Sequence, residues 1–163
     1  MRDQPSSPYR PSLSHGRDAR FEDRGWRSFF SYRDLGVKEA TGRDFDVRVV
    51  RSGPGHHRST GWHYHELDIQ VVYCIGGWEL IALEDGTVAK LVPGSCLQIP
   101  PGYVHNEIGY APDMEMLVLS APADARTVAV DDPTGWDGEA VERELAAQTA
   151  GGRLAEPWCW RDR

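Results

Sequence analysis

Two histidines placed two residues apart, followed by a glutamine and a third histidine, constrain this chain more than any other feature. They are His63 and His65, then Gln70, then His105 after a Pro-Pro-Gly turn. An extended strand directs alternate side chains to one face, so His63 and His65 point into the same space. Imidazole is the commonest transition-metal ligand, and a buried histidine pair without a partner is costly. The spacing therefore predicts strands that direct four donor side chains at one ion.

Short strands separated by turn signals, without helices between them, surround these donors. Residues 45–51 alternate apolar and charged side chains, which is typical of a half-buried strand. Between residues 78–83 and 88–92, the pair Asp85-Gly86 predicts a type I′ hairpin turn. Further strands are expected at residues 26–35, 61–65, 70–75, 96–99, 114–120 and 127–130. This pattern predicts an all-β antiparallel barrel or sandwich.

The two groups of donors resemble the two sequence signatures of the cupin superfamily. Matching positions are His63, His65 and Gly77 in the first signature and Gly94, Pro100, Gly102 and His105 in the second. Three positions depart: His57 replaces a leading glycine, Gln70 replaces the glutamate of the first signature, and Gly109 replaces the closing asparagine of the second. The resemblance spans residues 55–109 and implies a single RmlC-like jelly-roll barrel, to which we add a short C-terminal helix.

The same resemblance implies one divalent transition-metal ion held by His63, His65, Gln70 and His105. Glu66 and Asp68 compete with Gln70 as oxygen ligands, but strand register favours Gln70. Iron, zinc, nickel, manganese and cobalt all suit such donors. Because all four donors are uncharged, the ion would keep its full charge and attract a small anionic or chelating substrate.

Three functions follow from such a site. The first is a dioxygenase, in which the metal chelates an anionic substrate and activates oxygen. The second is a Lewis-acid isomerase, lyase or cyclase acting on a sugar acid or polyketide-like substrate. That chemistry needs a base, for which Tyr73, Tyr103 and Glu107 are the candidates. The third is ligand binding without catalysis. The sequence favours the first narrowly over the second.

Composition limits the partners and the compartment. The formal charge of −7 argues against a nucleic-acid or membrane-surface partner, since neither basic patch nor apolar span is evident. Three cysteines without a Cys-x-x-Cys pair indicate reduced thiols in a cytoplasmic protein. The resemblance to cupins adds the expectation of a homodimer, in which a terminal arm covers the neighbouring subunit.

The chain divides into three parts. Residues 1–24, rich in proline, serine, arginine and aspartate, predict a disordered or draped arm. Residues 25–131 form the predicted barrel. Residues 132–163 form a tail with a helix expected at residues 139–150, where alanine, glutamate and leucine are frequent. An aromatic pair at Trp158 and Trp160 is expected to pack against the barrel or a second subunit.

Overall fold

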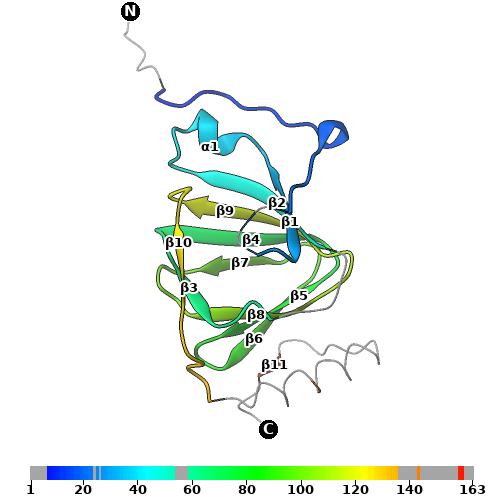
Figure 1. The fold of residues 1–163 in the computed structure, drawn as a ribbon, viewed down its shortest axis with the longest axis vertical. Coiled ribbons are helices and arrows are strands. Elements are labelled where there is room, and N and C mark those ends of the chain that lie inside the picture. Colours follow the sequence, from blue (N-terminus) through cyan, green and yellow to red (C-terminus); the bar gives the residue numbers. More distant parts are fainter. Residues whose placement is uncertain are drawn as a thin grey trace, which may run out of the picture.

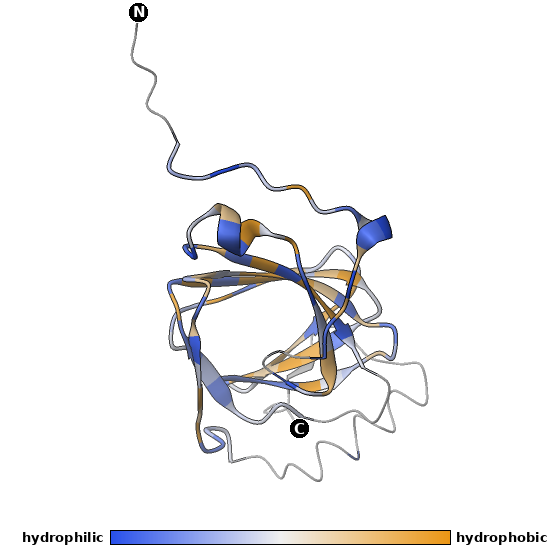
Figure 2. Ribbon diagram, turned by 45° about the horizontal axis from the view of Figure 1, so that its top comes forward, coloured by the Kyte–Doolittle hydropathy of each residue, from blue (hydrophilic) through white to orange (hydrophobic). Residues whose placement is uncertain are grey.

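The computed structural model describes residues 7–23, 25, 27–53, 59–135, 143 and 158–159. Its strands form two antiparallel sheets that face each other and enclose the interior (Figure 1). Hydrophilic and hydrophobic residues are interspersed along the strands of both sheets (Figure 2). The all-β jelly-roll prediction is confirmed.

The first sheet has five strands in the order β1-β2-β9-β4-β7. Their bounds are β1 Phe30–Asp34, β2 Asp46–Ser52, β9 Glu115–Ala121, β4 Ile69–Gly76 and β7 Cys96–Ile99. On β4 the side chains of Gln70, Val72 and Cys74 are buried, whereas Ile69, Tyr73 and Ile75 are exposed. The alternation that the sequence predicted for this strand therefore decides which residues reach the interior.

The second sheet has six strands in the order β10-β3-β8-β5-β6-β11. Their bounds are β10 Arg126–Ala129, β3 His63–Glu66, β8 His105–Tyr110, β5 Glu79–Leu83, β6 Thr87–Leu91 and β11 Trp158–Cys159. The sequence did not predict β8 as a strand. In the structure β8 joins β3 to β5, and the residues paired in register include His63 with His105 and Leu83 with His105.

The turn between β5 and β6 differs from the prediction. A type I′ turn needs positive φ at both central residues. Among the residues described there, only Gly86 has a positive φ, at 89°, and its N–H donates to the Leu83 carbonyl at 2.9 Å. The hairpin therefore has a three-residue loop closed by a left-handed glycine, so the type I′ prediction was wrong.

The described part of the N-terminal arm lies against the barrel that follows it in the chain. It contains a 3-10 turn, η1 Gly16–Asp18, and runs near the short helix α1 Val37–Ala40 (Figure 1). Arg10 N–H donates to the Ala40 carbonyl at 2.9 Å, and Glu22 bridges to Tyr32 of β1. Arg10 and Glu22 thus connect the arm to residues that follow it in the chain.

The tail is described only at residues 143 and 158–159. The backbone of Trp158 and Cys159 extends the second sheet by pairing with Val88 and Thr87 of β6. The helix predicted at residues 139–150 lies outside the described residues apart from Arg143, and Trp160 lies outside them too. No helix in the described part of the chain is long and apolar enough to cross a membrane.

The main core lies between the two sheets. Its fully or nearly buried members are Phe30, Tyr32, Val50, Val72, Cys74, Ile81, Leu91, Tyr110, Ala111, Met114, Met116 and Val118. Gly77, with φ of 65°, brings the chain so close to Met114 that a Cβ would lie 2.8 Å from the Met114 backbone. This close approach leaves no room for a side chain at position 77.

Candidate metal centre

Three histidine rings meet inside the barrel from two neighbouring strands. His63 and His65 come from β3 and His105 from β8, and all three are at most 5% exposed. The ring of His63 lies 4.4 Å from His105 and 5.0 Å from His65, and His65 lies 5.2 Å from His105, measured between centroids. One nitrogen from each ring lies within 4.8 Å of the others, which suits ligation of one ion.

Each histidine has an oxygen partner at Nδ1. The distances are 2.7 Å from His63 to the Gly61 carbonyl, 2.9 Å from His65 to Thr127 Oγ1, and 2.9 Å from His105 to the Tyr103 carbonyl. A carbonyl only accepts, so Nδ1 of His63 and His105 carries the proton and Nε2 keeps its lone pair. Such acceptors fix the tautomer and orientation of metal-binding histidines. They could not be identified from the sequence.

Burial favours the uncharged form of His63 and His65. Desolvation lowers the pKa of His65 to about 3, with the neighbouring His105 and His63 acting in the same direction. Desolvation also lowers the pKa of His63, against the opposing effect of Glu107. Neutral imidazole is the form that binds a metal, so the barrel holds two of these ligands ready for ligation at neutral pH.

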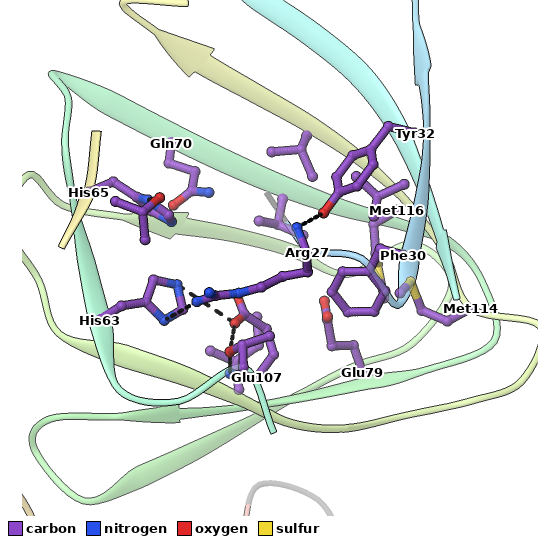
Figure 3. Close-up of a pocket in the computed structure, with 16 residues that line it drawn as sticks. Arg27, Phe30, Tyr32, His63, His65, Gln70, Glu79, Glu107, Met114 and Met116 are labelled. Carbon is purple, nitrogen blue, oxygen red and sulfur yellow. Dashed lines mark hydrogen bonds and ion pairs between the residues drawn. The ribbon is translucent and has the colours of Figure 1, made fainter. Parts of the chain in front are cut away.

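Two buried polar atoms in this region lack any hydrogen-bond partner among the described residues. They are Gln70 Oε1 and His105 Nε2. Buried polar atoms are rarely left unpaired, and a carbonyl oxygen and an imidazole lone pair both donate electrons to a cation. The orphaned atoms therefore fit a divalent ion bound beside them. Figure 3 shows the Gln70 carboxamide beside the His65 ring.

The competing oxygen donors lie elsewhere. Glu66 is exposed and its carboxylate accepts two hydrogen bonds from Arg126, at 2.9 and 2.7 Å. Asp68 is exposed as well, in the turn between β3 and β4. Of these oxygen donors, only Gln70 lines the cavity that the histidines border.

The sequence analysis expected four uncharged donors at this site. The structure adds a carboxylate beside them, that of Glu107. Its oxygens lie 3.8 Å from Nε2 of His63 and 3.8 Å from Nε2 of His105. The Thr60 hydroxyl donates a short hydrogen bond to the carboxylate and accepts one from the Glu107 N–H at 3.1 Å. These contacts hold the carboxylate beside the nitrogens that a metal would use.

A bulge in β8 follows this carboxylate in the chain. The pairing of β5 with β8 shifts by one residue between Leu80 and Ile81, so that Ile81 pairs with Glu107 and Glu79 pairs with Tyr110. One extra residue on β8 thus lets both Glu107 and Tyr110 face the interior.

Burial alone would raise the pKa of Glu107, but His105, His63 and the Thr60 hydrogen bond outweigh it and lower that pKa. Glu107 is therefore ionised.

The two tyrosines predicted as candidate bases lie away from this site. Tyr73 is 42% exposed on the outer face of β4, between Ile69 and Ile75. Tyr103 lies in the turn before β8, where burial and the acids Asp85 and Glu84 raise the pKa of its phenol. Of the three candidates, only Glu107 lines the cavity. His57, at a departed signature position, lies outside the described residues.

A cavity of about 60 Å³ adjoins the histidines and extends away from them between the sheets. Its walls include Phe30, Val50, Val72, Ile81, Met114, Met116 and Val118, and two charged side chains that the sequence analysis missed, Arg27 and Glu79. In Figure 3, Arg27 reaches towards His63, whereas Glu79 points into the cavity beside Phe30. The cavity thus has a polar end near the histidines and an apolar end near Met114.

Arg27 places a cation at the polar end. Its Nη2 lies 3.4 Å from His63 Nδ1, which already donates to Gly61, so this contact is not a good hydrogen bond. No described residue forms an ion pair with the Arg27 guanidinium. Its backbone N–H donates to Tyr32 Oη at 2.9 Å, and the Tyr32 ring packs so closely on Gly25 that a Cβ there would clash at 2.1 Å. The segment before β1 is thereby fixed over the cavity.

Glu79 places an acid at the apolar end. It is 5% exposed on β5, and no described residue forms a hydrogen bond or an ion pair with its carboxyl. Desolvation, followed by repulsion from Glu107, raises the pKa of Glu79 well above its ordinary value. The signal in the sequence was a lone acid in the apolar run 78–83, two residues before Ile81 and therefore on the same face.

No family model matches the sequence, and no curated protein matches it. Solved structures do. The polyketide cyclase RemF from Streptomyces resistomycificus is 25% identical, with a TM-score of 0.59 over 77% of this chain and 91% of that one. KdgF from Halomonas sp. is 19% identical, with a TM-score of 0.57 over 69% and 94%. A sugar phosphate isomerase of the cupin superfamily from Silicibacter pomeroyi is 22% identical, with a TM-score of 0.54 over 74% and 82%.

Proposed function

We propose that this chain, whose fold is that of the cupin structures it resembles, binds one divalent transition-metal ion and catalyses a Lewis-acid reaction on a small anionic or chelating carbonyl compound. The reaction class is an isomerisation, elimination or cyclisation that begins with loss of a proton next to a carbonyl. His63, His65, Gln70 and His105 would hold the ion. When bound, such an ion polarises a carbonyl oxygen and stabilises the charge of an enolate.

The position of Glu107 carries this proposal. An ionised carboxylate 3.8 Å from two ligand nitrogens is a base placed beside the metal position, and proton abstraction requires such a base. Glu107 takes the proton from the carbon next to the carbonyl, and the electron pair of the broken C–H bond moves to the carbonyl oxygen. Thr60 restrains the carboxylate while it does so. Return of the proton to another carbon gives an isomer, and departure of a neighbouring group gives an elimination.

Arg27 supports the preference for an anion. A divalent ion, the Glu107 carboxylate and the Arg27 guanidinium together leave two positive charges at the polar end of the cavity. We therefore still propose an anionic substrate. The reason is now the net charge of the ion, Glu107 and Arg27 together, and not an uncharged set of ligands. A carboxylate or enolate of the substrate can accept hydrogen bonds from the guanidinium, which is a strong donor to such groups.

The similarity to RemF favours the same reaction class, since that protein is named a polyketide cyclase. The dioxygenase that the sequence narrowly favoured stays a prediction, because no feature of the described residues supports it over proton abstraction. The base beside the ligand set is the observation that reverses the order of the two.

The test is deuterium exchange at the carbon between the two carbonyls of acetylacetone, followed by NMR with zinc-loaded protein. We expect Glu107→Gln to keep its zinc and lose about 100-fold in exchange rate, the usual contribution of a general base. Glu115→Gln, an acid on the outer side of β9 that pairs with Arg51, serves as the matched control. Equal exchange in Glu107→Gln, or turnover only with iron and with oxygen uptake at an electrode, would overturn the proposal.

A further inference from the structure

No contact within the described part of the chain stabilises the carboxyl group at the apolar end of the cavity. Glu79 is almost fully buried, and within the described residues its carboxyl has neither a hydrogen-bond donor nor a cation against it. Burying a polar group without a partner costs free energy, and a leucine at this position would fill the space without that cost. Buried groups left unpaired in a cavity are candidates for ligand contact.

The surroundings of Glu79 define what it would contact. Phe30, Ile81, Met114 and Met116 line the cavity with it, and Figure 3 shows the carboxyl directed into the space between Phe30 and Arg27. These side chains offer no hydrogen bonds to a ligand. A polyhydroxylated substrate would leave several hydroxyls unpaired against them, each at a cost of about 1–3 kcal/mol. An apolar chain or ring would bury its surface there at a gain.

The two carboxyl groups of the cavity differ in their surroundings. The Glu107 carboxylate accepts a hydrogen bond from the Thr60 hydroxyl, whereas no described residue donates to Glu79, and burial raises the pKa of Glu79. A protonated carboxyl donates a hydrogen bond, and an ionised one only accepts. Two carboxyls whose environments separate them in this way commonly have separate roles in one site.

We propose that Glu79 is a specificity-determining residue whose carboxyl donates a hydrogen bond to a second oxygen of the substrate. The substrate is then an apolar molecule with a chelating carbonyl group at one end and a further carbonyl or hydroxyl oxygen at the other. A poly-ketone or phenolic ketone fits this description, and a sugar acid does not. This inference rests on the proposed function for the placement of the chelating end.

Calorimetric titration of zinc-loaded protein tests it with three probes. They are a linear seven-carbon triketone, the seven-carbon diketone that lacks the far ketone, and galacturonate. We expect wild-type protein to bind the triketone about 10-fold more tightly than the diketone, as one added hydrogen bond allows. Galacturonate should bind more weakly than either ketone.

Two variants assign the preference to Glu79. Glu79→Leu should bind both ketones equally, because the donor is gone. Glu79→Gln should keep most of the preference, because its amide still donates. Glu115→Gln, outside the cavity, should behave as wild type. A triketone preference that persists in Glu79→Leu, or tighter binding of galacturonate by wild-type protein, would overturn the inference.

The controls separate this inference from the proposed function. If both ketones bind and His63→Ala abolishes binding, but Glu79→Leu changes nothing, the metal site stands and the role of Glu79 is wrong. If zinc-loaded wild-type protein binds neither ketone, both are wrong. Zinc content and thermal unfolding of each variant show that the barrel and its ligands are intact, so that a changed preference reports on the cavity.

Discussion

The two ends of the cavity differ in how their side chains are held in place. At the polar end, each histidine has an oxygen at Nδ1, and Glu107 has the Thr60 hydroxyl. At the apolar end, the single carboxyl of Glu79 has no such support among the described residues. The polar end is a site built to hold charge in a fixed geometry, whereas the apolar end leaves its one polar group free for a ligand.

This contrast shows how a small barrel can divide binding from chemistry. Groups that must not move during a reaction are held by hydrogen bonds from the backbone and neighbouring strands. A group that only forms a selective hydrogen bond to the substrate can remain unpaired until the substrate binds. The free protein is then less stable than it would be with an apolar residue at that position. Variants at each end should therefore differ in kind: ligands at the polar end should change metal binding, and Glu79 should change selectivity and stability.

The largest expected effect is loss of metal from the polar end. His63→Ala and His105→Ala should each weaken zinc binding by at least about 100-fold. Loss of only the hydrogen-bond partner of a metal-binding histidine already lowers metal affinity by about 10–100-fold, and these variants remove the histidine itself. Both rings are buried, so the fold should be checked by circular dichroism while elemental analysis measures zinc. His15→Ala, in the exposed N-terminal arm, is the matched control. Unchanged zinc in both variants would show that these histidines are not the ligands.

A smaller effect is expected when the charge of the polar end is changed without removing a ligand. Gln70→Glu supplies the glutamate of the cupin signature that the sequence resembles and lowers the net charge near the ion by one. Zinc should be retained, and calorimetry should show malonate binding weakened by about 10-fold, which corresponds to 1.4 kcal/mol. Gln98→Glu adds the same charge on β7, where Gln98 is exposed. Malonate bound equally or more tightly by Gln70→Glu would contradict the account of anion preference.

The polar end could be predicted from the sequence because its main determinants are local. His63, His65 and Gln70 reach the interior by strand alternation, and each is buried as that period requires. Glu107, two residues after His105, follows from the same period once residues 105–110 are recognised as a strand. What the sequence could not supply were partners brought from other strands, such as Thr127 of β10.

The two charged side chains that the sequence analysis missed, one at each end of the cavity, depend on tertiary structure. Arg27 enters the cavity because the segment before β1 folds back onto Tyr32, and no periodicity records that contact. Glu79 sits in an apolar strand in which neighbours on both faces are buried, so alternation alone did not mark it as unusual. The β8 bulge that sets its register with Tyr110 is likewise invisible in composition.

An effect of similar size, and the one most specific to the apolar end, is the stability of Glu79→Leu. Removing an unpaired buried carboxyl should regain about 1–2 kcal/mol, which raises Tm by about 2–4 °C per kcal/mol for a chain of this size. The gain should depend on pH. The folded protein keeps the proton of Glu79 above the ordinary value of 4.5, so wild-type stability falls as pH rises from about 4.5 through the raised pKa. Leucine does not titrate, and the difference in Tm between variant and wild type should be larger at about pH 8 than at about pH 5. Glu79→Gln should show the same pH dependence relative to wild type, since it cannot ionise either. A lower Tm for Glu79→Leu at both pH values would mean that the carboxyl stabilises the barrel, and the contrast between the two ends of the cavity would then fail.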